Sequence, residues 1–457
     1  MNNDRPVSDP ADLGVREASA ALAARTLSSR ELVEACLARI HERDGVHTFD
    51  GDPESINAWV RVYEEDALEA ADRAQEALAR AREDAPPLCG IPIGLKDLYA
   101  AAGKPLTASS RVLDEVPERD CDAWARLREA GMVLLGHLHT HEFAAGGTTD
   151  QVGNPWNLEL SPGGSSGGSA AALASRTVPA ATGTDTAGSL RIPSAACGTA
   201  AIKPTRHFVS IRGIVPLSPT LDNAGPMTRT VGDLEPLLAA MTGVAPPPTR
   251  RPLRRFVLSP QIEELDPDVA DGLDAALEAL GRLGAERIEP SPPALDGDTE
   301  SGGFDLLCTE MLVYHRRFDD RRDRYRPSIL EFLDAGEERK MTGEEYFAVQ
   351  MGRDETAGAW ADWFAEHDVD AVLEPTIPIV ARERGHGYEK AFTDAAEISL
   401  TKQWNWVGLP AVALPSGVGT RSGLPTSVSL IGARGADWDL LAWGSALEAE
   451  LGEVTPP

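Results

Sequence analysis

The sequence predicts an α/β protein with a sheet covered by helices, and two observations carry this prediction. Between residues 88 and 245, short runs of β-forming residues alternate with helical runs and Gly-rich turns, a pattern typical of an α/β sheet. Strand-like runs return after residue 370, so the C-terminal part is expected to complete the sheet. A chain of 457 residues can form two or three domains or one large α/β unit.

Residues 1–85 are predicted to be mainly helical. Ser28 and Glu31 have the spacing of a capping box, which marks the start of a helix. Apolar residues then recur at helical spacing: Leu32, Val33, Cys36, Leu37 and Ile40. A short strand is expected at 56–62, followed by an Ala-rich helix from Glu64 to Arg82.

Residues 86–245 are expected to form the core that carries the chemistry. Strands are predicted at 91–95, 133–135 and 178–182, and a helix at 170–174. Both kinds of element lie close to Gly/Ser-rich turns, so polar groups should gather where strands end and helices begin.

Residues 246–369 are more helical and more charged, and we expect an insertion or outer layer there. The charged run at 316–326 is predicted to be a solvated helix face. Residues 370–457 should complete the sheet. Three strands and a final helix are predicted in this part: 371–373, 411–414, 427–431 and a helix from Asp437.

Composition excludes several classes of partner. The chain has 43 basic and 72 acidic residues and a net charge of −29, which disfavours nucleic acid and anionic membranes as main partners. No apolar run is long enough to span a membrane, and residues 1–14 do not have the pattern of a signal peptide. The five cysteines are scattered without ligand spacing, as expected for reduced thiols in a cytoplasmic protein.

Two Gly/Ser-rich turns stand out, SPGGSSGGS at 161–169 and GTDTAGS at 183–189. Backbone N–H groups in such turns can bind an anion or a developing oxyanion. Neither turn has the Gly-Lys-Ser/Thr ending of a phosphate-binding loop. Residues 163–167 match the Gly-x-Ser-x-Gly pattern of a nucleophile elbow, but Pro162 interrupts the strand that an elbow requires.

Lys96 ends the apolar run at 91–95 and is one of only six lysines in the chain. Burial disfavours the charged amine and lowers its pKa toward the range that a general base needs. Such a lysine could activate a serine in one of the two turns. The alternative is a purely structural ion pair between Lys96 and the neighbouring Asp97.

Four segments closely resemble the amidase signature family: GIPIGLKD at 90–97, SPGGSSGGSAAALAS at 161–175, GTDTAGSLRIPSAACGTAAIKPT at 183–205 and LDNAGPMTRTVGDL at 221–234. Further similarity lies near both ends and leaves out about 246–369. The resemblance implies one amidase-signature domain over 1–457, with a mixed, mostly parallel twisted sheet packed between helices.

The resemblance also implies a Ser–cis-Ser–Lys triad. Lys96 corresponds to the base, Ser165 to the serine that follows a cis peptide bond, and Ser189 to the nucleophile. Backbone N–H groups of Thr186, Ala187, Gly188 and Ser189 correspond to the oxyanion hole. The family's reaction needs no metal and no cofactor, only a small-molecule amide, ester or carbamate and water. A monomer and a homodimer are both compatible with this reaction.

This sequence departs from the family at Ala187, where relatives commonly have glycine. Similar turns occur in allophanate hydrolases of the family, which extends the expected substrates to aryl carbamates, as in a urethanase. An aryl leaving group is expected because aromatic residues are predicted near the pocket: Trp156, Phe208, Trp404 and Trp406.

Two other functions remain open. The catalytic subunit of the glutamine-dependent tRNA amidotransferase shares these motifs and works docked to a partner. His137, His139 and His141 recur at every second position, and we expect them to support the structure or line the pocket. The alternative is that they bind the metal of a metal-dependent amidohydrolase.

Overall fold

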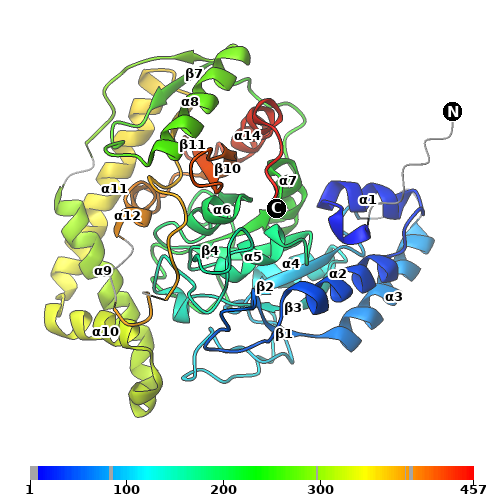
Figure 1. Ribbon diagram of the computed structural model, residues 1–457. Helices are drawn as coiled ribbons and strands as arrows, with labels where there is room; N and C mark the ends of the chain where they lie inside the picture. Colours follow the sequence, from blue (N-terminus) through cyan, green and yellow to red (C-terminus); the bar gives the residue numbers. More distant parts are fainter. Residues whose placement is uncertain (1–8, 82–85, 295–296, 386, 391–394, 457) are drawn as a thin grey trace.

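An eleven-stranded sheet runs through the middle of the computed structural model, which describes residues 9–81, 86–294, 297–385, 387–390 and 395–456 (Figure 1). The spatial order is β1-β3-β2-β4-β6-β5-β10-β11-β9-β7-β8. The strands are β1 (Trp59–Val62), β2 (Pro92–Lys96), β3 (Val133–Leu138), β4 (Ala180–Asp185), β5 (Ala200–Lys203), β6 (Asn223–Thr228), β7 (Arg255–Leu258), β8 (Glu286–Arg287), β9 (Ala371–Pro375), β10 (Ala411–Val418) and β11 (Pro425–Gly432).

Helices cover the sheet, as predicted. The α-helices are α1 (Val15–Ala23), α2 (Ser29–Arg43), α3 (Glu64–Ala81), α4 (Asp122–Glu129), α5 (Gly167–Ala174), α6 (Arg191–Cys197), α7 (Val231–Thr242), α8 (Pro267–Arg282), α9 (Gly297–His315), α10 (Pro327–Arg339), α11 (Gly343–Glu366), α12 (Ala395–Ile398), α13 (Lys402–Trp406) and α14 (Asp437–Leu451). Helix α14 packs on β10, α7 and α8, whereas α5 and α6 pack on each other and on the central strands.

The sheet is mixed, as predicted, but the expectation that it is mostly parallel is wrong. Among the described strands, β2 pairs in parallel with β3 and β4, and β7 with β8 and β9, while the other six pairs are antiparallel. Strands β10 and β11 are joined by a short hairpin, which cannot form the long crossover that a parallel pair requires. Parallel pairing is therefore confined to the two sides of the sheet.

The predicted helical segment 246–369 does more than cover the sheet. Helices α9, α10 and α11 pack together at one side of the molecule (Figure 1). However, the same segment also supplies β7 and β8, which form one edge of the sheet through the pairing of β7 with β9. Within the charged run at 316–326, residues Arg316–Arg324 form a 3₁₀ helix. Most of its side chains are exposed, but Phe318 and the following Tyr325 are buried.

Most predicted elements are present within a few residues of their expected bounds. Ser28 and Glu31 form the capping box at the start of α2, and α14 begins at Asp437. Strands β5 and β6 were not predicted as strands, and β6 contains Gly225 and Pro226, which normally disfavour a strand. Residues 1–8 and the predicted helix end at Arg82 lie outside the described residues.

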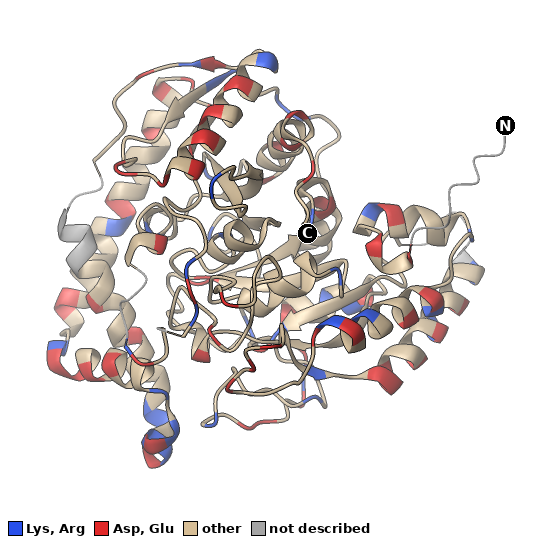
Figure 2. Cartoon of the chain, in the orientation of Figure 1, with Lys and Arg blue, Asp and Glu red and all other residues tan. Residues whose placement is uncertain are grey.

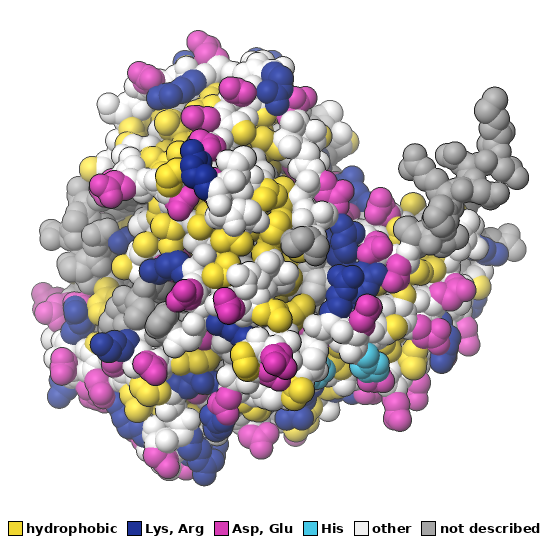
Figure 3. Space-filling model, in the orientation of Figure 1, with side chains coloured by type: hydrophobic (Ala, Val, Ile, Leu, Met, Phe, Trp, Pro, Cys, Tyr) yellow, Lys and Arg dark blue, Asp and Glu magenta, His cyan; other side chains and the backbone are white. Residues whose placement is uncertain are grey.

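Charge is concentrated on the outer elements. Acidic side chains lie along α3 and α8, whereas the central strands carry few charges (Figure 2). Over the face shown in Figure 3, basic and acidic side chains are interspersed with apolar ones. No helix in the part of the chain that the structure describes is long and apolar enough to cross a membrane.

Candidate active site

Lys96 lies at the carboxyl end of β2 and is fully buried. Its amine Nζ is 2.7 Å from Ser165 Oγ, 2.8 Å from Ser166 Oγ and 2.8 Å from Thr184 Oγ1. Because β2 and β4 are parallel neighbours, their carboxyl ends meet at one edge and bring Lys96 beside Thr184. The predicted lysine at the end of a strand and the predicted serine of a distant turn are thus in direct contact.

The surroundings of Lys96 favour its neutral form. Burial lowers the pKa of the amine well below its usual value, and the negative charges of Asp185 and Asp222 oppose this shift without cancelling it. The alternative of an ion pair with Asp97 is wrong. The Asp97 carboxylate instead accepts hydrogen bonds from the backbone N–H groups of Thr107 and Ser109, because neighbouring residues of a strand face opposite sides.

Ser165 follows a cis peptide bond after Gly164, as the family resemblance implied. Its carbonyl oxygen accepts hydrogen bonds from the His141 N–H at 3.0 Å and from Thr149 Oγ1 at 3.3 Å. Only glycine fits at position 164, since a Cβ there would lie 2.0 Å from the carbonyl oxygen of Thr148. The backbone around Ser165 is therefore fixed on both sides.

Ser189 is in the turn between β4 and α6, with only 6% of its surface exposed. The turn touches the cis-serine loop, because the Ser166 N–H donates to the Ser189 carbonyl oxygen at 3.3 Å. Asp185 closes the turn: its carboxylate accepts from the N–H of Gly188 at 2.8 Å and of Leu190 at 3.2 Å. The structure therefore places Lys96, the cis-serine loop of Ser165 and the turn of Ser189 side by side.

Asp185 is itself held by a fully buried ion pair. Arg191 donates from Nε and from a terminal nitrogen to the two carboxylate oxygens, both at 2.9 Å, and both residues are 0% exposed. Asn405 donates to the same carboxylate at 2.9 Å. Burial alone would raise the pKa of Asp185, but the Arg191 charge and these hydrogen bonds outweigh burial and hold the pKa below its usual value.

The predicted oxyanion hole requires one correction. The Gly188 N–H donates to Asp185, so it is already used within the turn and does not point to a substrate oxygen. Gly188 has a φ of +138°, where an L side chain is strained. The N–H groups of Thr186, Ala187 and Ser189 remain the predicted oxyanion donors.

The chain matches the family model described as Amidase over residues 31–441. The chain belongs to the amidase signature family. It is 32% identical, over an alignment 500 positions long, to a glutamyl-tRNA(Gln) amidotransferase subunit of Anaeromyxobacter sp. (strain K), and the alignment covers 99% of both chains. As a member of this family, the chain is a carbon–nitrogen hydrolase.

Solved structures give the same assignment. One described as a crystal structure of amidase superposes with a TM-score of 0.85 at 32% identity, covering 96% of this chain and all of the other. A 6-aminohexanoate cyclic dimer hydrolase superposes with a TM-score of 0.85 at 27% identity, covering 98% and 99% of the two chains. The mixed sheet between helices is thus the fold of amidase-signature proteins.

The three alternating histidines do not share one site. His137 bonds Tyr63 and the carbonyl of Tyr99, whereas the Nδ1 atom of His141 faces the carbonyl oxygen of Thr148. Burial lowers the pKa of both His139 and His141 to about 3. Among the described residues, no three His, Cys, Asp or Glu side chains are arranged to bind one metal ion, so the geometry gives the metal alternative no support.

The backbone of the histidine segment has a clear structural role in this amidase-signature chain. His141 donates its N–H to Ser165, and the His139 carbonyl oxygen accepts from the Gly168 N–H at 3.1 Å. The end of β3 therefore runs alongside the cis-serine loop and positions it.

The aromatic residues expected near the pocket mostly belong to the core. Trp404 and Trp406 lie in a hydrophobic cluster with Trp360 and Trp363. Phe208 packs edge-on against Trp438, and Trp156 Nε1 donates to the carbonyl oxygen of Cys197. These contacts stabilise the fold, so they do not support the expectation of an aryl leaving group.

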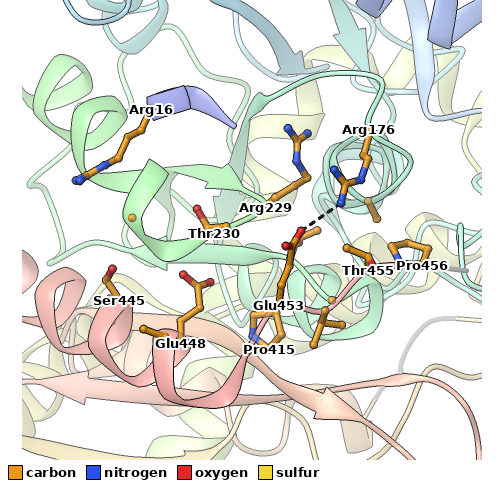
Figure 4. A pocket seen from close by; sticks show the side chains of 17 residues that line it. Arg16, Arg176, Arg229, Thr230, Pro415, Ser445, Glu448, Glu453, Thr455 and Pro456 are labelled. Atoms are coloured by element: carbon orange, nitrogen blue, oxygen red, sulfur yellow. Dashed lines mark hydrogen bonds and ion pairs between the residues drawn. The ribbon is translucent and has the colours of Figure 1, made fainter. Parts of the chain in front are cut away.

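A hollow of about 490 Å³ lies near the C-terminus, away from the catalytic candidates (Figure 4). Arg176 forms an ion pair with Glu453 across it at 3.2 Å. Arg229 donates to the carbonyl oxygen of Val178 at 3.0 Å. Arg176 therefore ties the C-terminal segment to the domain, and none of Lys96, Ser165 and Ser189 lines the hollow.

Sequence reasoning missed several residues that complete the site. Asp185 and Arg191 stand inside the quoted motif, and a buried acid six residues before an arginine could have signalled their pairing. Asn405, by contrast, lies 214 residues from Arg191, to which it is bonded. No local pattern marks such a contact.

The Asp185–Arg191 pair gives a prediction about stability. We expect Arg191→Met to lower the free energy of unfolding by about 3–5 kcal/mol, because it leaves the Asp185 charge buried without a partner. The matched control is Arg282→Met, since Arg282 and its partner Glu450 are 52% and 37% exposed. That change should cost at most about 1 kcal/mol. Urea unfolding followed by circular dichroism measures both, and equal losses would contradict the account.

Proposed function

We propose that this chain is a stand-alone amidase that cleaves the C–N bond of small uncharged carboxylic amides through an acyl-enzyme on Ser189. The observation that carries the proposal is the contact of a buried lysine amine with the cis-serine, Lys96 Nζ to Ser165 Oγ at 2.7 Å. A neutral amine can accept a proton from the serine hydroxyl beside it, so Lys96 can act as the base and Ser165 as the proton relay.

In the first half of the reaction, Ser189 attacks the substrate carbonyl carbon. Its proton passes to Ser165 while the Ser165 proton passes to the neutral amine of Lys96, which becomes an ammonium. The carbonyl oxygen becomes an oxyanion that accepts hydrogen bonds from the N–H groups of Thr186, Ala187 and Ser189. Donors held in a fixed turn stabilise this charge without reorganisation.

In the second half, the proton returns along the same path. Ser165 gives a proton to the leaving nitrogen and is reprotonated by Lys96, the C–N bond breaks, and the amine departs. Water then attacks the acyl-enzyme carbonyl carbon and loses its proton through the same relay. The acid is released, Ser189 regains its hydroxyl, and Lys96 ends as a neutral amine.

The surroundings of the turn support a compact, uncharged acyl group. An apolar cluster of Ile192, Ala195 and Ile377, with Ile398 packed against it, lies next to Gly188, whose Cβ would be 2.6 Å from Ile192 Cδ1. The nearby Asp185 charge is already paired with Arg191. Esters and aryl carbamates have the same carbonyl target, and we include them in the proposed substrate class.

A second candidate is the catalytic subunit of a tRNA-dependent amidotransferase. The observation that favours it is the relative from Anaeromyxobacter, which carries that name and aligns over 99% of this chain. The net charge of −29 argues against it, because binding to RNA phosphates needs a basic surface. The two candidates differ in whether the purified chain alone hydrolyses simple amides.

The first test uses a panel of nitroanilide, nitrophenyl ester and nitrophenyl carbamate substrates with the purified chain. We expect turnover without any partner, and we expect Ser189→Ala to abolish it. Ser165→Ala and Lys96→Met should each lower kcat about 10³-fold or more, and the double variant should be little worse, because the residues act as one unit.

The matched control for this test is Ser169→Ala. Ser169 is fully buried in α5, and its hydroxyl donates to the Thr182 carbonyl oxygen, so activity should stay near that of the unmodified chain. Near-normal rates in Ser165→Ala would remove the relay. No turnover of any substrate by the purified chain would favour the amidotransferase candidate.

The second test is the pH dependence of kcat/KM. Only neutral Lys96 accepts a proton, and burial lowers its pKa, so the rate should rise with pH and reach a plateau well below the ~10.4 of free lysine. His139 and His141 have pKa values of about 3 and stay neutral over this range. Their charge therefore does not produce the rise.

Lys203→Met is the control for the pH profile. Lys203 is also buried, with a pKa lowered to about 7 by burial, but its amine donates to the Pro204 carbonyl oxygen rather than to a serine. The variant should keep the same rise. A rate that falls as pH increases, or a rise that disappears in Lys203→Met, would contradict the role of Lys96.

A further inference from the structure

A second buried carboxylate contacts the turn that carries Ser189. Asp222, which is 8% exposed, accepts a hydrogen bond from the Thr186 hydroxyl at 2.5 Å. Thr186 is three residues before Ser189 and supplies one of the predicted oxyanion donors. Its hydroxyl is thus bonded to Asp222.

Asp222 is in turn held by the loop that precedes β6. Its carboxylate accepts from the N–H of Leu217 at 3.0 Å and of Ser218 at 3.2 Å. At 2.5 Å, the bond from the Thr186 hydroxyl is the shortest of the hydrogen bonds that this carboxylate accepts. Burial raises the pKa of Asp222 to about 7.

The same loop is bound to the helices of the 246–369 segment. Glu310 of α9 accepts from Ser218 Oγ at 2.7 Å, from the N–H and hydroxyl of Thr220 at 3.1 and 2.7 Å, and from the Tyr346 hydroxyl of α11 at 2.7 Å. A continuous chain of hydrogen bonds thus leads from α11 through Glu310 and Asp222 to the nucleophile turn.

We propose that Asp222 is a positioning residue for acyl transfer, which holds Thr186 and with it the oxyanion donors, and that Glu310 extends this control to the 246–369 helices. The inference rests on the proposed function. Among the described residues, Asp222 forms no hydrogen bond with Ser189 or Lys96, so it acts through Thr186. A segment that lies outside the shared motifs would in this way set the geometry of the reacting turn.

The test removes the bond without changing the shape of the side chain. Thr186→Val should lower kcat about 10- to 100-fold, the scale of a small misplacement of reacting groups, while KM changes less than about twofold. Thr186→Ser keeps the hydroxyl and should recover most of the loss. Thr186→Val combined with Asp222→Ala should be little worse than Asp222→Ala alone, because the Thr186 hydroxyl acts only through its bond to Asp222.

The matched control is Thr242→Val. Thr242 is buried to a similar degree, and its hydroxyl donates to the Leu238 carbonyl oxygen within α7, so the variant should keep kcat. Glu310→Gln changes the outer end of this series of hydrogen bonds, in α9 and not in the nucleophile turn. It therefore tests the inference even if Thr186→Val does not fold. It should lower kcat in the same direction without changing KM.

The outcomes separate this inference from the proposed function. Full kcat in Thr186→Val or Glu310→Gln, an equal loss in Thr186→Ser, or additive losses in the double variant would each overturn the positioning role while leaving the amidase proposal intact. If Ser189→Ala remains as active as the unmodified chain, the proposed function fails, and the positioning role fails with it.

Discussion

The amine of Lys96 is surrounded by three hydroxyl groups and not by a carboxylate. The rest of the site depends on this set of partners. An ammonium in a buried site needs a negative partner, whereas a neutral amine is satisfied by hydroxyls that both donate and accept. The Thr184 hydroxyl lies beside Lys96 because β2 and β4 are parallel neighbours, whereas the hydroxyls of Ser165 and Ser166 come from the loop that precedes α5. Strand pairing and the cis-serine loop together surround the amine with hydroxyl partners.

A neutral Lys96 also requires that nearby carboxylates be paired with other groups. The Asp185 charge acts to raise the pKa of Lys96, but Arg191 is paired with it in a fully buried contact. The same carboxylate closes the turn through the N–H groups of Gly188 and Leu190. One ion pair therefore shapes the nucleophile turn and limits the electrostatic pull on the base.

The sequence was sufficient to identify Lys96 and the two serine turns, and Lys96 and Ser165 are in contact as predicted. Sequence-based predictions were wrong where the structure depends on contacts between residues far apart in the chain. The Asp97 alternative failed because the successive residues Lys96 and Asp97 face opposite sides where β2 ends. Strand β6 was missed because Pro226 disfavours strands but is tolerated at its place in the sheet.

Other features could not be read from the sequence at all. The use of the Gly188 N–H by Asp185 depends on how the turn closes, which residue types alone do not determine. Most of the aromatic residues expected at the pocket instead pack in the core, as Trp404 does with 1% of its surface exposed. The contacts of Glu310 join helices of the 246–369 segment to a loop about 90 residues earlier, beyond the reach of any local pattern.

The most direct test of the central claim is the titration of the Lys96 amine by NMR. The chain has only six lysines, so ¹³Cε-labelled lysine gives few signals, and spectra of Lys96→Met and Lys203→Met assign the two buried ones. We expect the Lys96 signal to titrate well below the ~10.4 of free lysine and to be that of a neutral amine where the enzyme is active. A signal that remains that of an ammonium up to about pH 10 would contradict the account.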